Sequence, residues 1–316
     1  MRILIVKTTS MGDVVHATPA ISDIRKVRPG VEIDWLVEAP FADIVRMHPA
    51  VRRVIPLSWR KWRGSMWRRD TRSAIAELRQ ELRRDAYDLV IDLQGLLKSV
   101  LWGLQARGPL VGYDRSSIRE PMAALCYSRG AKVSRELHAV ERCRRLVALH
   151  LGYPFPASRA DFGLIASSGS WQAPVLGAAL IPCASRVEKL WPLEHWIALG
   201  KRLRSARLKP VVLWGSEAER LRAEQIADAC EGVVPPFLGV GDMAAVLKRM
   251  RQIVGLDTGF TQLGAALGAP TIGIYCDHEP GLAGITGSGP VASLGGKGQV
   301  PSLEQVMVQL ERHLKR

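Results

Sequence analysis

The chain has 316 residues, of which 47% are hydrophobic and 23% are charged, and its formal net charge is +14. This composition excludes the disordered and fibrous classes, and the length favours two domains of about 150 residues each. No apolar run approaches the roughly 18 residues of a membrane-spanning helix, and the N-terminal run is too short for a signal peptide, so we expect a cytoplasmic protein.

The cysteines and the distribution of charge indicate which kinds of site and partner to expect. The chain has five cysteines, an odd number with no CxxC pair, which argues against a disulfide framework and a zinc site. Residues 1–157 hold 27 Lys and Arg against 16 Asp and Glu, a net of +11, which leaves +3 for the rest. A positive first half predicts a polyanionic partner, either nucleic acid or a phosphate-rich membrane surface.

The chain opens with a strand, a polar loop and a helix. Residues 3–6 form a short β-branched run, typical of a strand buried on both faces of a parallel sheet. Polar and glycine residues over 8–12 favour a tight turn, and residues 14–26 carry apolar side chains at helical spacing. Ligands of open α/β sheets bind beyond the carboxyl ends of the strands, so this loop is a candidate ligand site.

Asp13 lies in this first loop and has two interpretations. An acidic residue in the first turn of a helix is favoured there by the unpaired N–H groups and by the helix dipole. A carboxylate in a ligand crevice can also act as a general base that takes a proton from an attacking hydroxyl. Position in the sequence does not decide between the two.

Strands and helices alternate through the rest of the first half, which predicts a parallel sheet. The predicted strands cover residues 31–37, 51–56, 87–93 and 110–113. The predicted helices cover residues 41–48, 71–84 and 138–151, and a further helix opens at 119–121. Residues 94–99 form a second polar loop at a strand end, in which Gln94 and Lys98 are candidates to face a ligand.

The segment 58–72 interrupts this alternation. Its tryptophans Trp59, Trp62 and Trp67 are interleaved with five arginines and one lysine. We expect the rings to lie at an anionic, partly apolar surface with the guanidinium groups on phosphates. Two alternatives are a solvated basic face with buried rings, and a nucleic-acid site. Against nucleic acid, the chain has no RNP-like, helix-turn-helix or zinc-finger pattern.

Residues 152–177 contain Pro154, Pro156 and Pro174 and small polar residues without clear periodicity. We therefore place the linker at 156–177, between a first domain, 1–155, and a second, 178–316. The predicted strands of the second domain cover residues 179–182, 209–214, 252–257 and 270–275. Its predicted helices cover residues 193–205, the stretch after 219 up to 230, the stretch from 259 through 267, and 303–316. The closing helix can pack back on the first domain.

The second domain carries candidate residues for a nucleotide. Asp257, Thr258 and Gly259 lie where a strand ends and a helix begins, which is typical of an anion site. Lys189 can add a positive charge for a phosphate, and Glu219, near another strand end, suits a ribose diol. No GxGxxG or P-loop motif occurs, so the pattern predicts a nucleotide diphosphate held without a P-loop.

Eight short motifs follow one another along the chain: KTTSMGD at 7–13, RKWR at 60–63, DLQGLLKS at 92–99, REP at 119–121, HAVER at 138–142, KLWP at 189–192, WG at 214–215 and DTG at 257–259. In this order and at this spacing they resemble the lipopolysaccharide heptosyltransferases, inverting enzymes of GT-B fold. The resemblance spans nearly the whole chain. It implies two Rossmann-like domains whose parallel sheets face each other across a cleft, the first for the acceptor and the second for the donor.

The resemblance also implies a reaction. L-glycero-D-manno-heptose would pass from ADP-heptose to the inner Kdo sugar of lipid A that carries two Kdo units, with Asp13 as the general base. No metal and no other cofactor would be required. The enzyme would be peripheral on the cytoplasmic face of the inner membrane, with no nucleic-acid partner. The sequence makes no prediction of the oligomeric state.

The candidate site residues fall into two sets. Those for the donor are Ser10, Gly12, Ser185, Lys189, Glu219, Asp257, Thr258, Gly259 and Gln262. Those for the Kdo carboxylates and lipid A phosphates of the acceptor are Arg60, Lys61, Arg63, Lys98, Arg119 and His138. Gln262 departs from the family pattern D-T-G-x-x-H, but its amide can still donate a hydrogen bond. Subgroups that act on a heptose acceptor are an alternative, although the motifs at 58–63 and 138–142 favour the subgroup that acts on Kdo.

Overall fold

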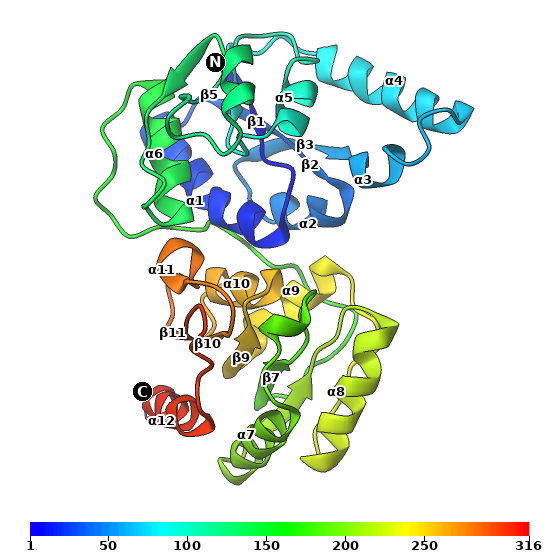
Figure 1. Cartoon of the computed structure of the whole chain (residues 1–316), viewed down its shortest axis with the longest axis vertical. Coiled ribbons are helices and arrows are strands. Elements are labelled where there is room, and N and C mark those ends of the chain that lie inside the picture. Colours follow the sequence, from blue (N-terminus) through cyan, green and yellow to red (C-terminus); the bar gives the residue numbers. More distant parts are fainter. Residues whose placement is uncertain (316) are drawn as a thin grey trace. The chain divides into compact units, whose positions relative to one another are not determined.

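The computed structural model describes residues 1–315 and divides the chain into two compact units, residues 1–164 and 165–316. Each unit contains one sheet of parallel strands with helices packed around it (Figure 1). The predicted α/β class with two Rossmann-like units is therefore confirmed. The boundary between the units falls within residues 156–177, the stretch expected to be a linker.

The first unit is a six-stranded sheet in the order β3-β2-β1-β4-β5-β6. Its strands are β1 (Arg2–Val6), β2 (Glu32–Glu38), β3 (Val51–Leu57), β4 (Leu89–Asp92), β5 (Leu110–Tyr113) and β6 (Arg129–Ala131). All of its strand pairs are parallel. The order reverses between β1 and β4, and the loops beyond the carboxyl ends of these strands are where such sheets bind ligands.

The helices of the first unit follow the strands in alternation. They are α1 (Met11–Val27), α2 (Ala42–Arg46), α3 (Trp59–Trp62), α4 (Arg69–Arg83), α5 (Leu97–Gly103) and α6 (Ala139–Leu151), with short 3₁₀ turns η1 (Ala39–Phe41) and η2 (Pro121–Cys126). Helices α1 and α6 pack against each other (Figure 1). The apolar run of β1 is fully buried, as its β-branched composition predicts.

The second unit is a five-stranded parallel sheet in the order β11-β10-β9-β7-β8. Its strands are β7 (Gly177–Ile181), β8 (Lys209–Val212), β9 (Gln252–Leu256), β10 (Thr271–Tyr275) and β11 (Val291–Gly295). Its helices are α7 (Leu193–Ser205), α8 (Glu217–Ala229), α9 (Val240–Arg249), α10 (Gly259–Ala266), α11 (Pro280–Ala283) and α12 (Leu303–Leu314), with the 3₁₀ turn η3 (Val187–Lys189). Here the strand order reverses between β7 and β9, which marks the second candidate binding position.

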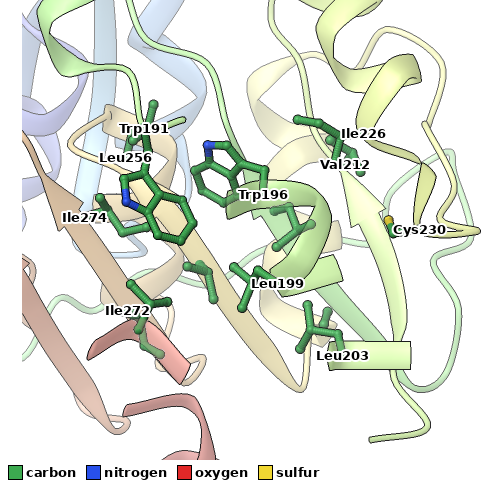
Figure 2. Close-up of a cluster of buried hydrophobic side chains, with 14 of the residues drawn as sticks. Trp191, Trp196, Leu199, Leu203, Val212, Ile226, Cys230, Leu256, Ile272 and Ile274 are labelled. Carbon is green, nitrogen blue, oxygen red and sulfur yellow. The ribbon is translucent and has the colours of Figure 1, made fainter. Parts of the chain in front are cut away.

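The core of the second unit forms around two tryptophans. Trp191 and Trp196 are fully buried, with ring centroids 5.2 Å apart in an edge-to-face arrangement (Figure 2). The Trp191 indole N–H donates to the carbonyl of Pro301 at 2.8 Å, which fixes the chain just before α12. Val306 and Leu310 of α12 belong to the same core. The closing helix thus packs on α7, β10 and β11 of the second unit.

Several elements were not predicted, and four of them, β6, β11, α9 and α5, each have a weak local signal. Strand β6 has three residues, two of them exposed, and β11 is only partly buried, so neither shows the apolar pattern of a central strand. Helix α9 follows a stretch rich in proline and glycine. Helix α5 occupies part of the segment expected to be a polar loop, and its sequence LKSVLWG does not separate an apolar side clearly from a polar one. No helix over residues 1–315 is long and apolar enough to span a bilayer.

Candidate active site

The loop between β1 and α1 places a carboxylate where the first sheet reverses its strand order. Ser10 is the N-cap of α1, and Asp13 is the third residue of the helix. The Oδ2 atom of Asp13 accepts hydrogen bonds from the N–H and the hydroxyl of Ser10, each at 2.8 Å. Its Oδ1 atom lies 3.9 Å from the Nζ atom of Lys7. Gly12, the second residue of the helix, is half-buried beside them.

The surroundings of Asp13 favour its ionised form. Burial acts to raise the pKa of this carboxyl, but the charge of Lys7 and the hydrogen bonds from Ser10 outweigh burial and hold the pKa below its ordinary value of 3.8. The side chain is still 40% exposed. A reachable carboxylate that is ionised at neutral pH can take a proton from a hydroxyl.

A cavity of about 90 Å³ opens beside Asp13. Its lining residues are Lys7, Asp13, His16, Leu93, Gln94, Tyr113, Arg119, Ala139, Arg142 and Cys143. They come from the loops after β1 and β4, from α1, β5 and α6, and from the segment before η2. Three of them are lysine or arginine and one is an acid, so the cavity suits an anionic group next to a base.

Gln94 ties together the two loops that flank the reversal of strand order. Its Oε1 atom accepts hydrogen bonds from the backbone N–H groups of Thr8 and Thr9, each at 3.1 Å. The Nζ atom of Lys98 donates to the Thr9 hydroxyl at 2.7 Å. Asp92, fully buried, accepts from the N–H of Gln94 at 2.7 Å and so fixes the start of the second loop.

Three of the cations predicted for the acceptor lie near one another. Burial lowers the pKa of Lys98, and the nearby charges of Arg60 and Arg119 lower it further. The carboxyl of Glu38 accepts a hydrogen bond from the N–H of Arg60 at 3.3 Å and faces the same cluster. Arg119 also lines the cavity beside Asp13. The structure thus gathers Arg60, Lys98 and Arg119 around one position.

The other predicted acceptor residues are placed differently. His138 is the N-cap of α6, where its Nδ1 atom accepts from the N–H of Val140 at 3.2 Å. Its ring packs edge-on against His16, with centroids 5.4 Å apart, at the border of the cavity. Lys61 and Arg63 are exposed and do not line the cavity.

The tryptophans of segment 58–72 depart from the expectation that all three rings face a membrane. Trp62 is buried, and the rings of Trp59 and Trp62 each lie 5.9 Å from the ring of Trp102 in α5. These contacts dock α3 on α5 and bury apolar area that would otherwise be hydrated. Only Trp67 is exposed, at 76%.

In the second unit, the end of β9 faces the loop after β7. The Nζ atom of Lys189, in η3, lies 2.6 Å from the Oδ2 atom of Asp257 and also donates to the Asp257 carbonyl at 3.4 Å. Thr258 is the N-cap of α10, and its hydroxyl accepts from the N–H of Thr261 at 3.4 Å. Gly259 is the first residue of α10, and Ser185 is exposed in the loop after β7. A lysine beside a helix N-terminus is suited to a phosphate group.

The last two donor candidates have local partners. The Glu219 carboxylate accepts from the N–H of Gly215 at 2.8 Å, where β8 leads into α8. Gln262 is buried, and its amide donates to the carbonyl of Ala283 at 2.8 Å. In this position the glutamine joins α10 to α11. Among the residues that the structure describes, no group of three or more His, Cys, Asp and Glu side chains is arranged as a metal site.

Some residues that line the first cavity were not among the candidates. Lys7 and Arg142 lie inside motifs that the resemblance covers, and His16 follows Asp13 by three positions, which places both on one side of α1. That spacing was the available signal for His16. Tyr113 and Cys143 read from the sequence as ordinary core residues, and both are buried.

Comparison with known proteins places this arrangement in a family. The profile of "Glycosyltransferase family 9 (heptosyltransferase)" matches residues 75–308. Lipopolysaccharide heptosyltransferase 1 of Pseudomonas aeruginosa is 41% identical over 296 residues, which cover 92% of this chain and 83% of that protein. The corresponding enzyme of Escherichia coli K12 is 39% identical over 289 residues, 90% of each chain.

A solved structure gives the same result. The structure of E. coli heptosyltransferase WaaC with ADP superimposes with a TM-score of 0.90 at 35% identity, covering 99% of this chain and 100% of that one. The reversal of strand order, the buried strand β1 and the loops with Asp13 and Asp257 are therefore parts of a fold shared over essentially the whole length. This chain belongs to glycosyltransferase family 9, the heptosyltransferases.

Proposed function

We propose that this chain is lipopolysaccharide heptosyltransferase I, which transfers L-glycero-D-manno-heptose from ADP-heptose to the inner Kdo of Kdo₂-lipid A. The observation that carries the acceptor assignment is the cavity that Lys7, Arg119 and Arg142 line together with Asp13. Kdo has a carboxylate close to its hydroxyl groups, so cations beside a base fit this sugar. A heptose acceptor without a carboxylate leaves such cations unpaired.

Asp13 acts as the general base. Its carboxylate takes the proton of the Kdo hydroxyl, the hydroxyl oxygen forms a bond to the anomeric carbon, and the bond from that carbon to the ADP oxygen breaks. Attack on the face opposite ADP gives inversion in one displacement. The lowered pKa of Asp13 keeps the base ionised, and Ser10 fixes its orientation through two hydrogen bonds.

The second unit binds the donor. A related structure contains E. coli WaaC with ADP-2-deoxy-2-fluoro heptose, with a TM-score of 0.86, 33% identity and 99% coverage of each chain. Lys189 and the N-terminus of α10 at Thr258 and Gly259 stabilise the negative charge that grows on the departing diphosphate. Glu219 accepts from the ribose diol. This charge stabilisation requires no metal ion.

Identifying the product of the transfer reaction tests the proposed acceptor. The purified chain is incubated with ADP-heptose and Kdo₂-lipid A, and separately with an acceptor that ends in heptose, in buffer with a chelator and in buffer with Mg²⁺. We expect one heptose added to Kdo₂-lipid A, detected by mass spectrometry, with equal rates in both buffers. Transfer to the heptose acceptor alone contradicts the acceptor assignment, and a strict requirement for Mg²⁺ contradicts the metal-free mechanism.

The location of the acceptor follows from its chemistry. Kdo₂-lipid A is anchored in a membrane by its acyl chains, so the enzyme works as a peripheral protein on the cytoplasmic face of the inner membrane. The excess of positive charge in the first half of the chain supports this assignment, because it suits an anionic lipid surface.

A further inference from the structure

Helix α5 exposes a stripe of leucines to solvent. Leu97, Leu101 and Leu104 follow one another at helical spacing, and their side chains are 51%, 45% and 51% exposed. The remaining positions of the helix are largely buried, at Ser99, Val100, Trp102 and Gly103. The leucine stripe is therefore the apolar part of this helix that stays exposed to solvent within residues 1–315. Isolated exposed leucines are common, but a continuous stripe indicates an interaction surface.

The turn η2 extends this stripe. Helix α5 and η2 are in contact, and η2 exposes Met122 and Leu125 at 62% and 66%. The backbone N–H of Leu97 donates to the carboxylate of Glu120 at 2.7 Å, which fixes the two elements together. We call the five exposed side chains the α5–η2 face: Leu97, Leu101, Leu104, Met122 and Leu125.

The charged residues of the segment that carries the α5–η2 face are mainly basic. Residues 93–131 contain five basic and two acidic side chains. Both acids have internal partners, since Glu120 binds the start of α5 and Asp114 accepts from the hydroxyls of Ser116 and Ser117. The basic side chains that follow each element, Arg107 after α5 and Arg129 after η2, are exposed.

We propose that the α5–η2 face inserts into the interface of an anionic lipid bilayer. Apolar side chains with a cationic border are the combination that binds such a surface, because the leucines leave water while the arginines meet lipid phosphates. This proposal rests on the proposed function for its biological setting and names the surface that meets the membrane. The α5–η2 face takes the place of segment 58–72 as the main membrane contact, since Trp59 and Trp62 are packed on Trp102.

The α5–η2 face is directly connected to the acceptor cavity. Gln94 lines the cavity and precedes α5 by three residues, and Arg119 lines it and precedes Glu120. The backbone carbonyl of Gly95 accepts from the N–H of Glu120 at 3.3 Å, which closes the link between the two segments. Insertion of the face thus holds the cavity close to the headgroup layer, where an acceptor anchored by acyl chains presents its sugars.

The test measures vesicle binding of the full chain. The variant carries Leu101→Gln, Leu104→Gln, Met122→Gln and Leu125→Gln, and its matched control carries Val175→Gln and Leu221→Gln, which replace side chains of the second unit that are 83% and 72% exposed. Vesicles of phosphatidylethanolamine with phosphatidylglycerol are compared with vesicles of phosphatidylcholine by sedimentation. We expect the variant to bind the anionic vesicles at least roughly ten-fold more weakly, and the control to bind as the wild type does.

Three further readouts make the result decisive. Unfolding temperatures of variant and wild type should agree, because the replaced side chains are exposed. Heptose transfer to a deacylated acceptor should be unchanged, while transfer to acceptor embedded in vesicles should fall with the vesicle affinity. Equal vesicle binding by variant and wild type overturns the proposal. The proposal is also overturned if sedimentation equilibrium shows that the wild type self-associates through the α5–η2 face and the variant does not, while both bind vesicles equally. If the variant loses vesicle binding but the wild type transfers heptose to no acceptor, the proposed function is wrong and the proposed membrane contact of the α5–η2 face is retained.

Discussion

The Nζ atom of Lys189 lies 2.6 Å from the Oδ2 atom of Asp257, so the cation proposed for the donor diphosphate is held by an acid at the start of α10. Both side chains are largely buried, at 19% and 16% exposure. The acid keeps the lysine extended toward the helix N-terminus, where an anion binds. The pair therefore positions the cation before the donor arrives.

Replacing Lys189 by Ala should weaken ADP binding by about ten-fold or more, because a phosphate loses a charge-assisted partner and Asp257 is left beside it. Lys189→Arg should retain part of the affinity. Isothermal titration with ADP measures both. Lys201→Ala, an exposed lysine in α7, is the control. An unchanged affinity in Lys189→Ala would place the diphosphate elsewhere.

Asp13→Asn should lower kcat by roughly 10²–10⁴-fold, the usual effect of removing a positioned general base. The affinity for ADP should stay near that of the wild type, since Asp13 lies in the first unit and the donor candidates around Asp257 lie in the second. Single-turnover kinetics and ADP titration separate the two effects. Turnover close to normal would leave Asp13 with its structural role at the helix terminus alone.

The pH profile tests the environment of the same carboxyl. The pKa of Asp13 is lowered, so the base stays ionised and kcat/KM should hold until the pH falls below the ordinary carboxyl range. Ser10→Ala removes one of the two hydrogen bonds that lower this pKa. The acid limb of the profile should then move to higher pH. A limb at the same pH in both proteins would assign the titration to another group.

Arg119→Ala should raise the KM for the Kdo acceptor by about ten-fold or more and leave ADP affinity unchanged, because this guanidinium lines the cavity beside Asp13. Arg115→Ala is the matched control, as Arg115 is exposed four residues earlier and outside the cavity lining. Steady-state kinetics with varied acceptor measure both. Equal effects of the two substitutions would point to a diffuse charge effect.

His48 makes the stability of the first unit depend on pH. Burial lowers its pKa to about 4, against an ordinary value of 6.5, although Asp161 acts in the opposite direction. Its Nδ1 atom accepts from the N–H of Ala50 and its Nε2 atom bonds Ser22, which suits the neutral ring. The unfolded chain therefore binds a proton that the folded chain does not, and stability falls as the pH drops from about 6.5 toward 4.

The expected loss of unfolding free energy is on the order of 2–3 kcal/mol over that range. Urea unfolding at a series of pH values measures it. In His48→Gln the stability at neutral pH should be lower, and its change between pH 6.5 and 4 should be smaller than in the wild type. An identical pH dependence in both proteins would show that other groups control acid unfolding.

The sequence predicted the elements whose signal is local. The buried run of β1 and the polar turn before α1 predicted the strand, loop and helix that form the first candidate binding position, because a parallel strand that is buried on both faces has few other interpretations. The motif around Asp257 did the same for the second. The chemistry proposed for both loops rests on residue types and spacing, which need no knowledge of tertiary contacts.

The rest depends on contacts between distant residues. Tyr113 reaches the cavity because β5 lies beside β4 in the sheet, and Arg142 reaches it because α6 packs on α1 and β5. From the sequence alone, Trp62 is expected at a membrane interface. Only its contact with Trp102, forty residues away, shows that the ring packs inside the first unit. Helix α5 was not predicted because leucines also occupy its solvent-exposed side, so the sequence lacks the usual alternation between apolar buried and polar exposed positions.

The double role proposed for Asp13 affects how substitutions at this position change stability and activity. Catalytic groups are often costly to the fold, and replacing them commonly makes a protein more stable at the expense of activity. Here the same carboxylate completes the first turn of α1, and its lowered pKa means that its ionised form favours the folded state. With Asp13 as the proposed general base, selection for folding and selection for turnover act in the same direction at this position, and a substitution there is expected to lower stability as well as activity.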